Sequence, residues 1–254
     1  MSVPPRAPPM PTVLSIAGSD SCGGAGIQAD LKTFSALGAD GATVLTAVTA
    51  QNSAGVRAIQ IMSADMVAAQ LDAVFDELDI RAVKLGMLAA TATVLAVADG
   101  LNRRRPPHVV LDPVMTATSG ALLLSEDAVA SMRSHLLPLV DCLTPNLAEA
   151  AVLLGVPCAT DEAQMAAQGR ALLALGPRAV LMKGGHAPLA EAVDLLVTPA
   201  GTQRFAARWV ETGRLHGTGC ILSAAIAAWL ARGAALADAV AQAKAHLTAT
   251  LACR

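Results

Sequence analysis

Short apolar runs alternate with segments of helical periodicity along most of the chain, and this alternation constrains the fold more than any other feature. The apolar runs that we predict to be strands are 12–17, 42–50, 81–85, 108–111, 141–143 and 179–182. The segments of helical periodicity between and after them are 25–37, 64–78, 90–101, 125–136, 146–154 and 161–175. Strands joined by helices form a mainly parallel sheet whose two faces are both covered, so the pattern predicts an α/β fold of this kind.

The last third of the chain departs from the alternation. Two apolar runs, 193–197 and 203–208, flank Pro199, Ala200 and Gly201, which predicts a hairpin. Two helices, 218–230 and 235–251, follow it. A length of 254 residues suits one large α/β domain or two small ones. Since no linker or change of composition interrupts the chain, we predict one domain over 12–254, after a proline-rich, disordered tail at 1–11 that is not a secretory signal.

Composition excludes several classes of protein. A net charge of -2 and an aromatic content of 2% provide neither a basic field nor a stacking platform for nucleic acid. The longest uncharged stretch of the C-terminal third, 215–230, is short for a membrane span. The cysteines are five in number and include no C-x-x-C pair, which argues against a disulfide framework and a zinc site. We therefore predict a cytoplasmic protein with reduced thiols that binds neither nucleic acid nor membrane.

The loops that follow the strands are where chemistry is expected, because ligands of open parallel sheets bind beyond the carboxyl ends of the strands. The first loop lies in the glycine-rich segment 17–30, AGSDSCGGAGIQAD. It lacks both the glycine spacing of a dinucleotide fingerprint and the Gly-Lys-Ser/Thr of a P-loop. The loop therefore forms either a flexible turn or a close approach to a different ligand.

A second glycine-containing segment, Gly217-Thr218-Gly219-Cys220, leads directly into an apolar helix. The backbone N–H groups at a helix start are unpaired and the helix dipole favours negative charge, so this segment suits a phosphate. The same position would lower the pKa of the Cys220 thiol and make it a candidate proton acceptor. The alternative is that Cys220 is a small buried apolar residue.

Three further positions carry charge or metal-binding groups after strands. Asn146 and Glu149 lie three residues apart and could orient magnesium through water, although the same pair is typical of a capping box. Lys183, in MKGGH, would suit a triphosphate, or it is simply a solvated lysine. Asp112 ends an apolar strand as either a functional carboxylate or the start of a turn.

Taken together and in order, seven motifs resemble the hydroxymethylpyrimidine/phosphomethylpyrimidine kinase family. These motifs are AGSDSCGGAGIQAD from 17, AVTAQNSAGV from 47, VKLGML from 83, VLDPVM from 110, LTPNLAEA from 143, LMKGGH from 181 and HGTGC from 216. The resemblance covers nearly the whole chain and implies a ribokinase-like three-layer α/β/α sandwich that acts as a homodimer. It also implies ATP-dependent phosphorylation, with Mg²⁺, of 4-amino-5-hydroxymethyl-2-methylpyrimidine and then of its monophosphate in thiamine biosynthesis.

The resemblance also implies a role for each motif residue. The implied substrate-binding residues are Gly18, Asp30, Gln51, Met87 and Val114. The implied ATP-binding residues are Lys183, Lys244, Thr218 and Asn146, with Asp112 and Glu149 near Mg²⁺. The implied catalytic residues are Cys220, Gly217, Gly219 and Lys183. The polar side chains suit the edge of an aminopyrimidine and the apolar ones its ring.

Two other functions remain open. A pyridoxal or pyridoxine kinase of the same superfamily would also act on an aromatic nitrogen ring that bears a CH₂OH group. The segments AQN at 50–52 and GGAGIQAD at 23–30 favour the pyrimidine substrate. A non-catalytic pyrimidine-binding protein would keep the fold without turnover, but the intact Gly217, Gly219, Cys220, Lys183 and Asp112 favour an enzyme.

Overall fold

The computed structural model of the chain describes residues 10–52, 55–116, 124–185, 191–210 and 217–253. Most of the predicted N-terminal tail therefore lies outside the described residues, as do His186 and His216 of the LMKGGH and HGTGC motifs. The carbonyl oxygen of Pro11 accepts a hydrogen bond from the amide of Asp40 at 3.0 Å.

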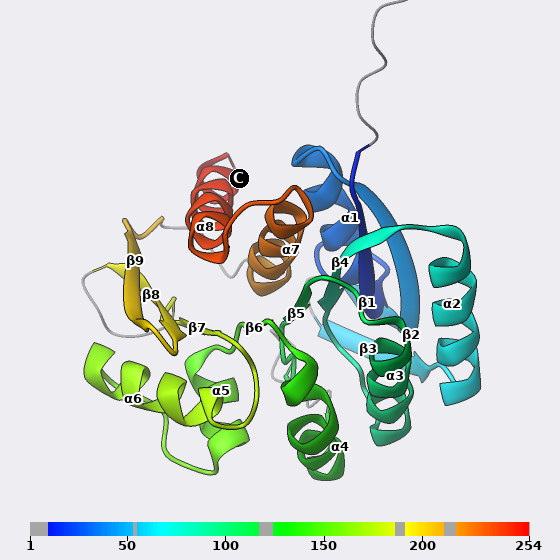
Figure 1. Cartoon of the computed structure of the whole chain (residues 1–254), viewed down its shortest axis with the longest axis horizontal. Helices are drawn as coiled ribbons and strands as arrows, with labels where there is room; N and C mark the ends of the chain where they lie inside the picture. The colour runs from blue at the N-terminus through cyan, green and yellow to red at the C-terminus, as the bar shows by residue number, and fades with distance from the viewer. Residues whose placement is uncertain (1–9, 53–54, 117–123, 186–190, 211–216, 254) are drawn as a thin grey trace, which may run out of the picture.

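One nine-stranded sheet runs through the described part of the chain, in the order β3-β2-β1-β4-β5-β6-β7-β8-β9 (Figure 1). The strands are β1 (Thr12–Asp20), β2 (Asp40–Asn52), β3 (Gly55–Ile61), β4 (Ile80–Leu85), β5 (Val109–Leu111), β6 (Cys142–Leu143), β7 (Val180–Lys183), β8 (Ala192–Thr198) and β9 (Gly201–Ala207). The strands from β2 to β7 in this order pair in parallel, whereas β3, β8 and β9 pair antiparallel at the two edges. The predictions of a mainly parallel sheet and of a β8–β9 hairpin are confirmed.

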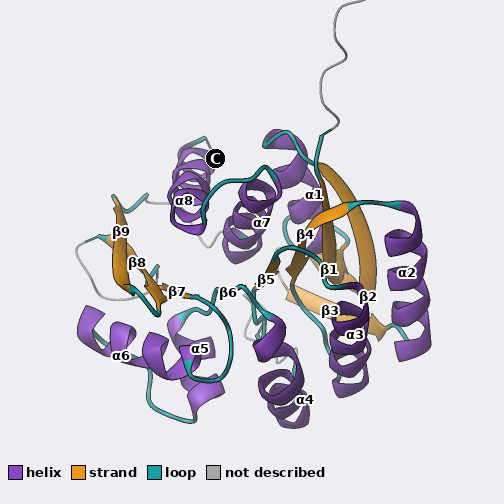
Figure 2. Ribbon diagram, in the orientation of Figure 1, coloured by secondary structure: helices purple, strands orange, loops and turns teal. Residues whose placement is uncertain are grey.

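Helices cover both faces of this sheet (Figures 1 and 2). One face carries α1 (Gly26–Ala36), α7 (Thr218–Ala231) and α8 (Leu236–Ala252). The opposite face carries α2 (Ala64–Glu77), α3 (Thr91–Arg104), α4 (Glu126–Ser131), α5 (Leu147–Leu154) and α6 (Glu162–Leu173). Two apolar cores fill the spaces between the sheet and the two helical layers. The architecture is the three-layer α/β/α sandwich predicted from the resemblance.

The helix α7 is the most deeply buried helix of the site-bearing layer. Its buried residues extend from Ile221 to Ala231 and lie on all sides of the helix, and it packs against both α1 and α8. Small alanine side chains allow this close packing on three sides. Among the helices in the described ranges, none is long and apolar enough to cross a membrane.

Three elements differ from the sequence-based expectation. The edge strand β3 is not predicted, because five of its residues in a row are exposed and it shows no buried face that would give a period of two. The strand β1 continues to Asp20, three residues beyond the predicted end at Ala17. The predicted helix 125–136 is α-helical only to Ser131 and continues as a π-helical turn over Met132–Leu136.

Candidate active site

A single cavity of about 870 Å³ opens at the carboxyl ends of the parallel strands, beside the start of α7. It collects side chains from strands that are far apart in the sequence, as expected for an open α/β sheet. Every predicted site residue except Asp30 lines it. Those residues are Gly18, Gln51, Met87, Asp112, Val114, Asn146, Glu149, Lys183, Gly217, Thr218, Gly219, Cys220 and Lys244.

The glycine-rich loop at one wall of the cavity is held by Asp20. One carboxylate oxygen accepts the N–H of Cys22 at 3.0 Å, and the other accepts those of Gly24 and Ala25 at 2.9 and 2.8 Å. Three backbone bonds to one carboxylate fix the path from β1 to α1. Sequence reasoning did not single out Asp20, although an aspartate between a strand and a glycine pair is typical of this local bonding.

The loop then meets the start of α7. Gly217, which precedes this helix, has a φ of 86°, and a Cβ atom on it would overlap the carbonyl oxygen of Gly24. Only glycine fits both the backbone conformation and the close approach. No side chain in the described ranges caps α7. Its first N–H groups therefore face the cavity as an anion-binding site.

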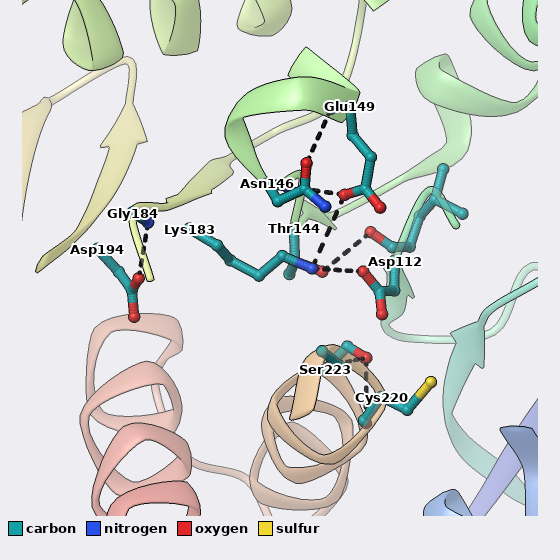
Figure 3. Close-up of polar contacts among 11 residues, drawn as sticks. Asp112, Thr144, Asn146, Glu149, Lys183, Gly184, Asp194, Cys220 and Ser223 are labelled. Carbon is teal, nitrogen blue, oxygen red and sulfur yellow. Dashed lines mark hydrogen bonds and ion pairs between the residues drawn. The ribbon is translucent and has the colours of Figure 1, made fainter. Parts of the chain in front are cut away.

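Lys183 joins two carboxylates at the centre of the cavity (Figure 3). Its Nζ atom lies 2.6 Å from Asp112 Oδ1 and 3.9 Å from Glu149 Oε2. Burial opposes the charge of Lys183, but Asp112 and Glu149 raise its pKa to about 12. Lys183 is therefore a fixed cation at neutral pH and not a solvated surface lysine.

Glu149 caps the helix α5 and also lines the cavity. Asn146 accepts the N–H of Glu149 at 2.9 Å, and Glu149 accepts the N–H of Asn146 at 2.7 Å. The capping box weighed as the alternative is therefore present. Burial raises the pKa of Glu149 to about 7, with a further contribution from Asp112 and an opposing one from Lys183.

The donor set around Lys183 fits magnesium that arrives with phosphates. The carboxylates of Asp112 and Glu149 border the same space, and Mg²⁺ is usually bound by one or two carboxylates, waters and substrate phosphates. Within the described ranges no group of three or more His, Cys, Asp or Glu side chains forms a metal cage. Protein ligands alone are thus too few, and phosphate oxygens would complete the coordination.

Cys220 borders the cavity in the first turn of α7, but its thiol is not activated. Burial raises the pKa of Cys220 to about 11, and the charges of Asp30 and Asp112 act in the same direction. Lys84 and the N–H of Gly26 oppose this rise but do not cancel it. The prediction of a lowered pKa is wrong, because burial and two carboxylates outweigh the helix terminus. The thiol is protonated at neutral pH.

Asp30 does not lie where the resemblance implied. Its side chain is wholly buried outside the cavity lining, and its Oδ2 atom accepts hydrogen bonds from Ser15 Oγ at 2.5 Å and Lys84 Nζ at 2.8 Å. In this structure Asp30 therefore bonds Ser15 and Lys84 behind the cavity lining. Instead, Lys84 borders the cavity. A lysine between the apolar residues Val83 and Leu85 near the end of a strand was the signal available in the sequence, since a charge buried there has to be paired.

The opposite end of the cavity is apolar and lies against α7 and α8. Leu222, Leu247 and Leu251 line it, together with Lys244. The Nζ atom of Lys244 lies 2.6 Å from Asp194 Oδ2. The cavity therefore has one end at β1, β2 and β4, a charged centre at α7, and an apolar end with a cation at α8.

Comparison with known proteins identifies the family. The sequence model described as phosphomethylpyrimidine kinase matches residues 20–254. A hydroxymethylpyrimidine/phosphomethylpyrimidine kinase of Rhizobium meliloti is 57% identical over 238 residues, which cover 94% of this chain and 89% of the relative. The chain belongs to the phosphomethylpyrimidine kinase family. The resemblance stated from the seven motifs is thereby confirmed, as is the prediction that the chain is a kinase.

Solved structures agree with membership of the phosphomethylpyrimidine kinase family. A phosphomethylpyrimidine kinase of Clostridium difficile has a TM-score of 0.84 and 40% identity, covering 94% of this chain and 99% of that one. A pyridoxal kinase of Staphylococcus aureus, in complex with AMP-PCP and pyridoxal, has a TM-score of 0.88 and 29% identity, covering 96% and 88%. Both activities thus occur on this fold, so overall shape does not separate their substrates.

Proposed function

We propose that the chain transfers phosphate from ATP to 4-amino-5-hydroxymethyl-2-methylpyrimidine, and then to the resulting monophosphate, in thiamine biosynthesis. The observation that carries the proposal is the cavity itself. It joins the end at β1, β2 and β4, called here the ring end, to an uncapped helix start and to the Lys183–Asp112–Glu149 cluster. The 57% identity to a kinase of that name supports the choice of substrate.

The ring end suits a substituted aminopyrimidine. The side chain of Gln51 offers both a donor and an acceptor, which matches the alternating groups of an aminopyrimidine edge. Met87 and Val114 offer apolar contact to the faces of the ring. A Cβ atom on Gly18 would lie 2.6 Å from Met87 Cε, so glycine here keeps the slot open.

The centre of the cavity suits phosphoryl transfer. The N–H groups of Gly219 and its neighbours at the start of α7, together with the ammonium of Lys183, would hold the equatorial oxygens of the transferred group. Asp112 and Glu149 would hold Mg²⁺, largely through water. When bound, that ion supplies charge neutralisation of the phosphates. The apolar α7–α8 end and Lys244 would receive the nucleotide, with Thr218 and Asn146 nearer the phosphates.

Cys220 is assigned the role of proton relay. Because its thiol is protonated at neutral pH, it cannot be a resting thiolate base. The transition state of phosphoryl transfer is loose and requires little prior deprotonation of the acceptor. The thiol would then orient the acceptor hydroxyl, and as the new O–P bond forms it would take up the hydroxyl proton while its own proton passes to an oxygen of the phosphoryl group being transferred.

The test is an ADP-release assay with Mg-ATP on three acceptors: the pyrimidine alcohol, its monophosphate and pyridoxal. We expect turnover of both pyrimidines and a product mass that corresponds to two added phosphates from the alcohol. Turnover of pyridoxal alone would favour the second candidate, which the TM-score of 0.88 to a pyridoxal kinase supports. Tight binding without ADP release on any acceptor would favour a non-catalytic binding protein.

We also propose that the chain is a single domain that works as a cytoplasmic homodimer. The exposed apolar side chains Val48, Ile59 and Ile61 lie on β2 and β3 at one edge of the sheet, where a second copy could cover them. All five cysteines are free, in keeping with a reducing compartment. Sedimentation velocity at micromolar concentration tests the dimer, and a monomer at all concentrations would contradict it.

A further inference from the structure

Three lysines in the described ranges line the cavity, and each is paired with a carboxylate. Lys183 pairs with Asp112 and Lys244 pairs with Asp194 at the centre and at the α8 end. The third, Lys84, is on β4, next to the ring end. The proposed function above uses the first two lysines and leaves Lys84 without a role.

Of the two residues of the ion pair between Lys84 and Asp30, Lys84 lines the cavity. Lys84 borders the cavity, whereas its partner Asp30, at 2.8 Å, does not. Lys84 is therefore the member of the pair that borders the cavity, although neither side chain is exposed to solvent. A Cβ atom on Gly86 would come within 2.9 Å of Lys84 Nζ, so the glycine leaves room for this ammonium.

A contribution to folding stability does not explain why Lys84 and Asp30 are buried as an ion pair. Both side chains are wholly buried, and Asp30 Oδ1 has no hydrogen-bond partner among the described residues. Buried ion pairs lose much of their attraction to desolvation, and apolar residues of similar size are often as stable. An incompletely bonded pair beside a cavity indicates a functional role.

Lys84 interacts electrostatically with two residues at the centre of the cavity. Cys220 and Asp112 both interact electrostatically with its ammonium. The effective dielectric constant inside a protein is well below that of water, so such a charge acts over several ångströms without direct contact.

The two proposed acceptors make different demands on this end of the cavity. The alcohol is neutral and has a proton to lose. The monophosphate carries close to two negative charges at neutral pH and enters a space that already contains Asp112 and Glu149. Its phosphate oxygen forms the new bond to the γ-phosphorus while the bond to the β–γ bridging oxygen breaks, and no proton has to be removed. The second acceptor needs a counter-charge more than a base.

We propose that Lys84 adapts the ring end of the cavity to the monophosphate acceptor. Its ammonium, held in place by Asp30, offsets the charge of the phosphate that receives the second phosphoryl group. The inference rests on the proposed function, and it makes Lys84 a determinant of acceptor specificity.

The decisive variant is the double substitution Lys84→Met with Asp30→Asn. It removes both charges, keeps the sizes of the side chains and avoids a buried carboxylate without its partner. We expect kcat/KM for the monophosphate to fall at least about tenfold more than kcat/KM for the alcohol, as removal of one nearby charge would produce. Retained turnover of the alcohol shows that the variant is folded.

Calorimetric titration of the monophosphate without nucleotide gives a readout independent of turnover, and the double variant should bind it more weakly than wild type. The single variant Asp30→Asn removes the carboxylate that favours the charged form of Lys84, so it too should bind the monophosphate more weakly than wild type. Equal losses for both acceptors in the double variant would overturn the role of Lys84, as would a wild-type protein that accepts the alcohol only. A wild-type protein that phosphorylates neither pyrimidine would instead overturn the proposed function.

Discussion

The carbonyl oxygen of Gly24 occupies the space that a side chain on Gly217 would need. This contact joins the loop after β1 to the start of α7, two segments that are almost two hundred residues apart in the chain. Because Asp20 fixes the loop through the N–H groups of Gly24 and Ala25, the position of the anion site depends on both ends of the sequence.

Gly217→Ala should abolish most of the activity. The substitution places a side chain at a φ of 86° and against Gly24 O, so the start of α7 has to move away from the cavity. We expect kcat to fall at least about a hundredfold, the effect of losing an anion-stabilising donor. The control is Gly233→Ala, because Gly233 has the same φ of 86° but nothing within 4 Å of its added Cβ. It should lose about 1–2 kcal/mol of stability and keep its activity. Equal activity losses in the two variants would contradict the contact with Gly24.

Cys220→Ala should slow phosphoryl transfer to the alcohol much more than transfer to the monophosphate. We expect kcat for the alcohol to fall about a hundredfold, at the low end of the range for acid–base groups, and kcat for the monophosphate to change little, since that acceptor has no hydroxyl proton. Burial raises the pKa of the Cys220 thiol to about 11. Because the protonated thiol is the form that acts as the relay, the wild-type rate with the alcohol should not rise in proportion to the thiolate fraction between about pH 7 and about pH 9. A tenfold rise per pH unit would instead identify a thiolate base.

Alkylation by iodoacetamide, followed by peptide mass, reports the same thiol directly. Cys22 is exposed and should react first at neutral pH, whereas Cys220 should react slowly and accelerate as the pH rises toward about 11. Rapid alkylation of Cys220 at neutral pH would show that the helix terminus lowers its pKa after all.

Gly18→Ala should weaken binding of the ring without affecting the nucleotide. Its Cβ atom would meet Met87 Cε at 2.6 Å, and Met87 lines the ring end, so displacing this methyl group would change the shape of that end. We expect KM for the pyrimidine alcohol to rise about tenfold, with KM for ATP within about twofold of wild type, since one misplaced methyl group is worth about 1–3 kcal/mol. A larger effect on ATP would mean that the two ends of the cavity have been assigned the wrong way round.

Glu149→Gln should remove a pH dependence of stability. Burial raises the pKa of Glu149 to about 7, above the value of about 4.3 in an unfolded chain. Between these values the folded protein keeps a proton that the unfolded chain releases, so stability falls as the pH rises through this window. Without magnesium, the variant should gain about 1–3 kcal/mol relative to wild type between about pH 4.5 and about pH 7.5, measured by urea unfolding.

Glutamine at position 149 also keeps the capping box of α5, because its side-chain oxygen can still accept the N–H of Asn146. Glu149→Ala serves as the control. It should show the same change of pH dependence but a lower stability at every pH, because it loses the cap. Parallel pH profiles for wild type and Glu149→Gln would contradict the raised pKa.

Most of the fold was predictable from short-range patterns. The strand–helix alternation indicated the parallel sheet, Pro199 to Gly201 indicated the β8–β9 hairpin, and the Asn146–Glu149 spacing indicated the cap of α5. These features depend on residues a few positions apart, which is the range over which periodicity and capping act. The strand β3 escaped prediction because it lies at an edge and buries no continuous face.

The sequence by itself determined the fold class, the family and many of the residues that gather at the cavity, but it did not single out Asp20 or Lys84. Only the tertiary structure decided which charged groups pair with one another around that cavity and how their pKa values shift. It paired Asp30 with Lys84, which is 54 positions away, and left Asp30 outside the cavity lining. It also buried Cys220 near the carboxylates of Asp30 and Asp112, and this reversed the predicted direction of its pKa shift. Burial and charge depend on neighbours brought together from distant parts of the chain, and no local pattern contains them.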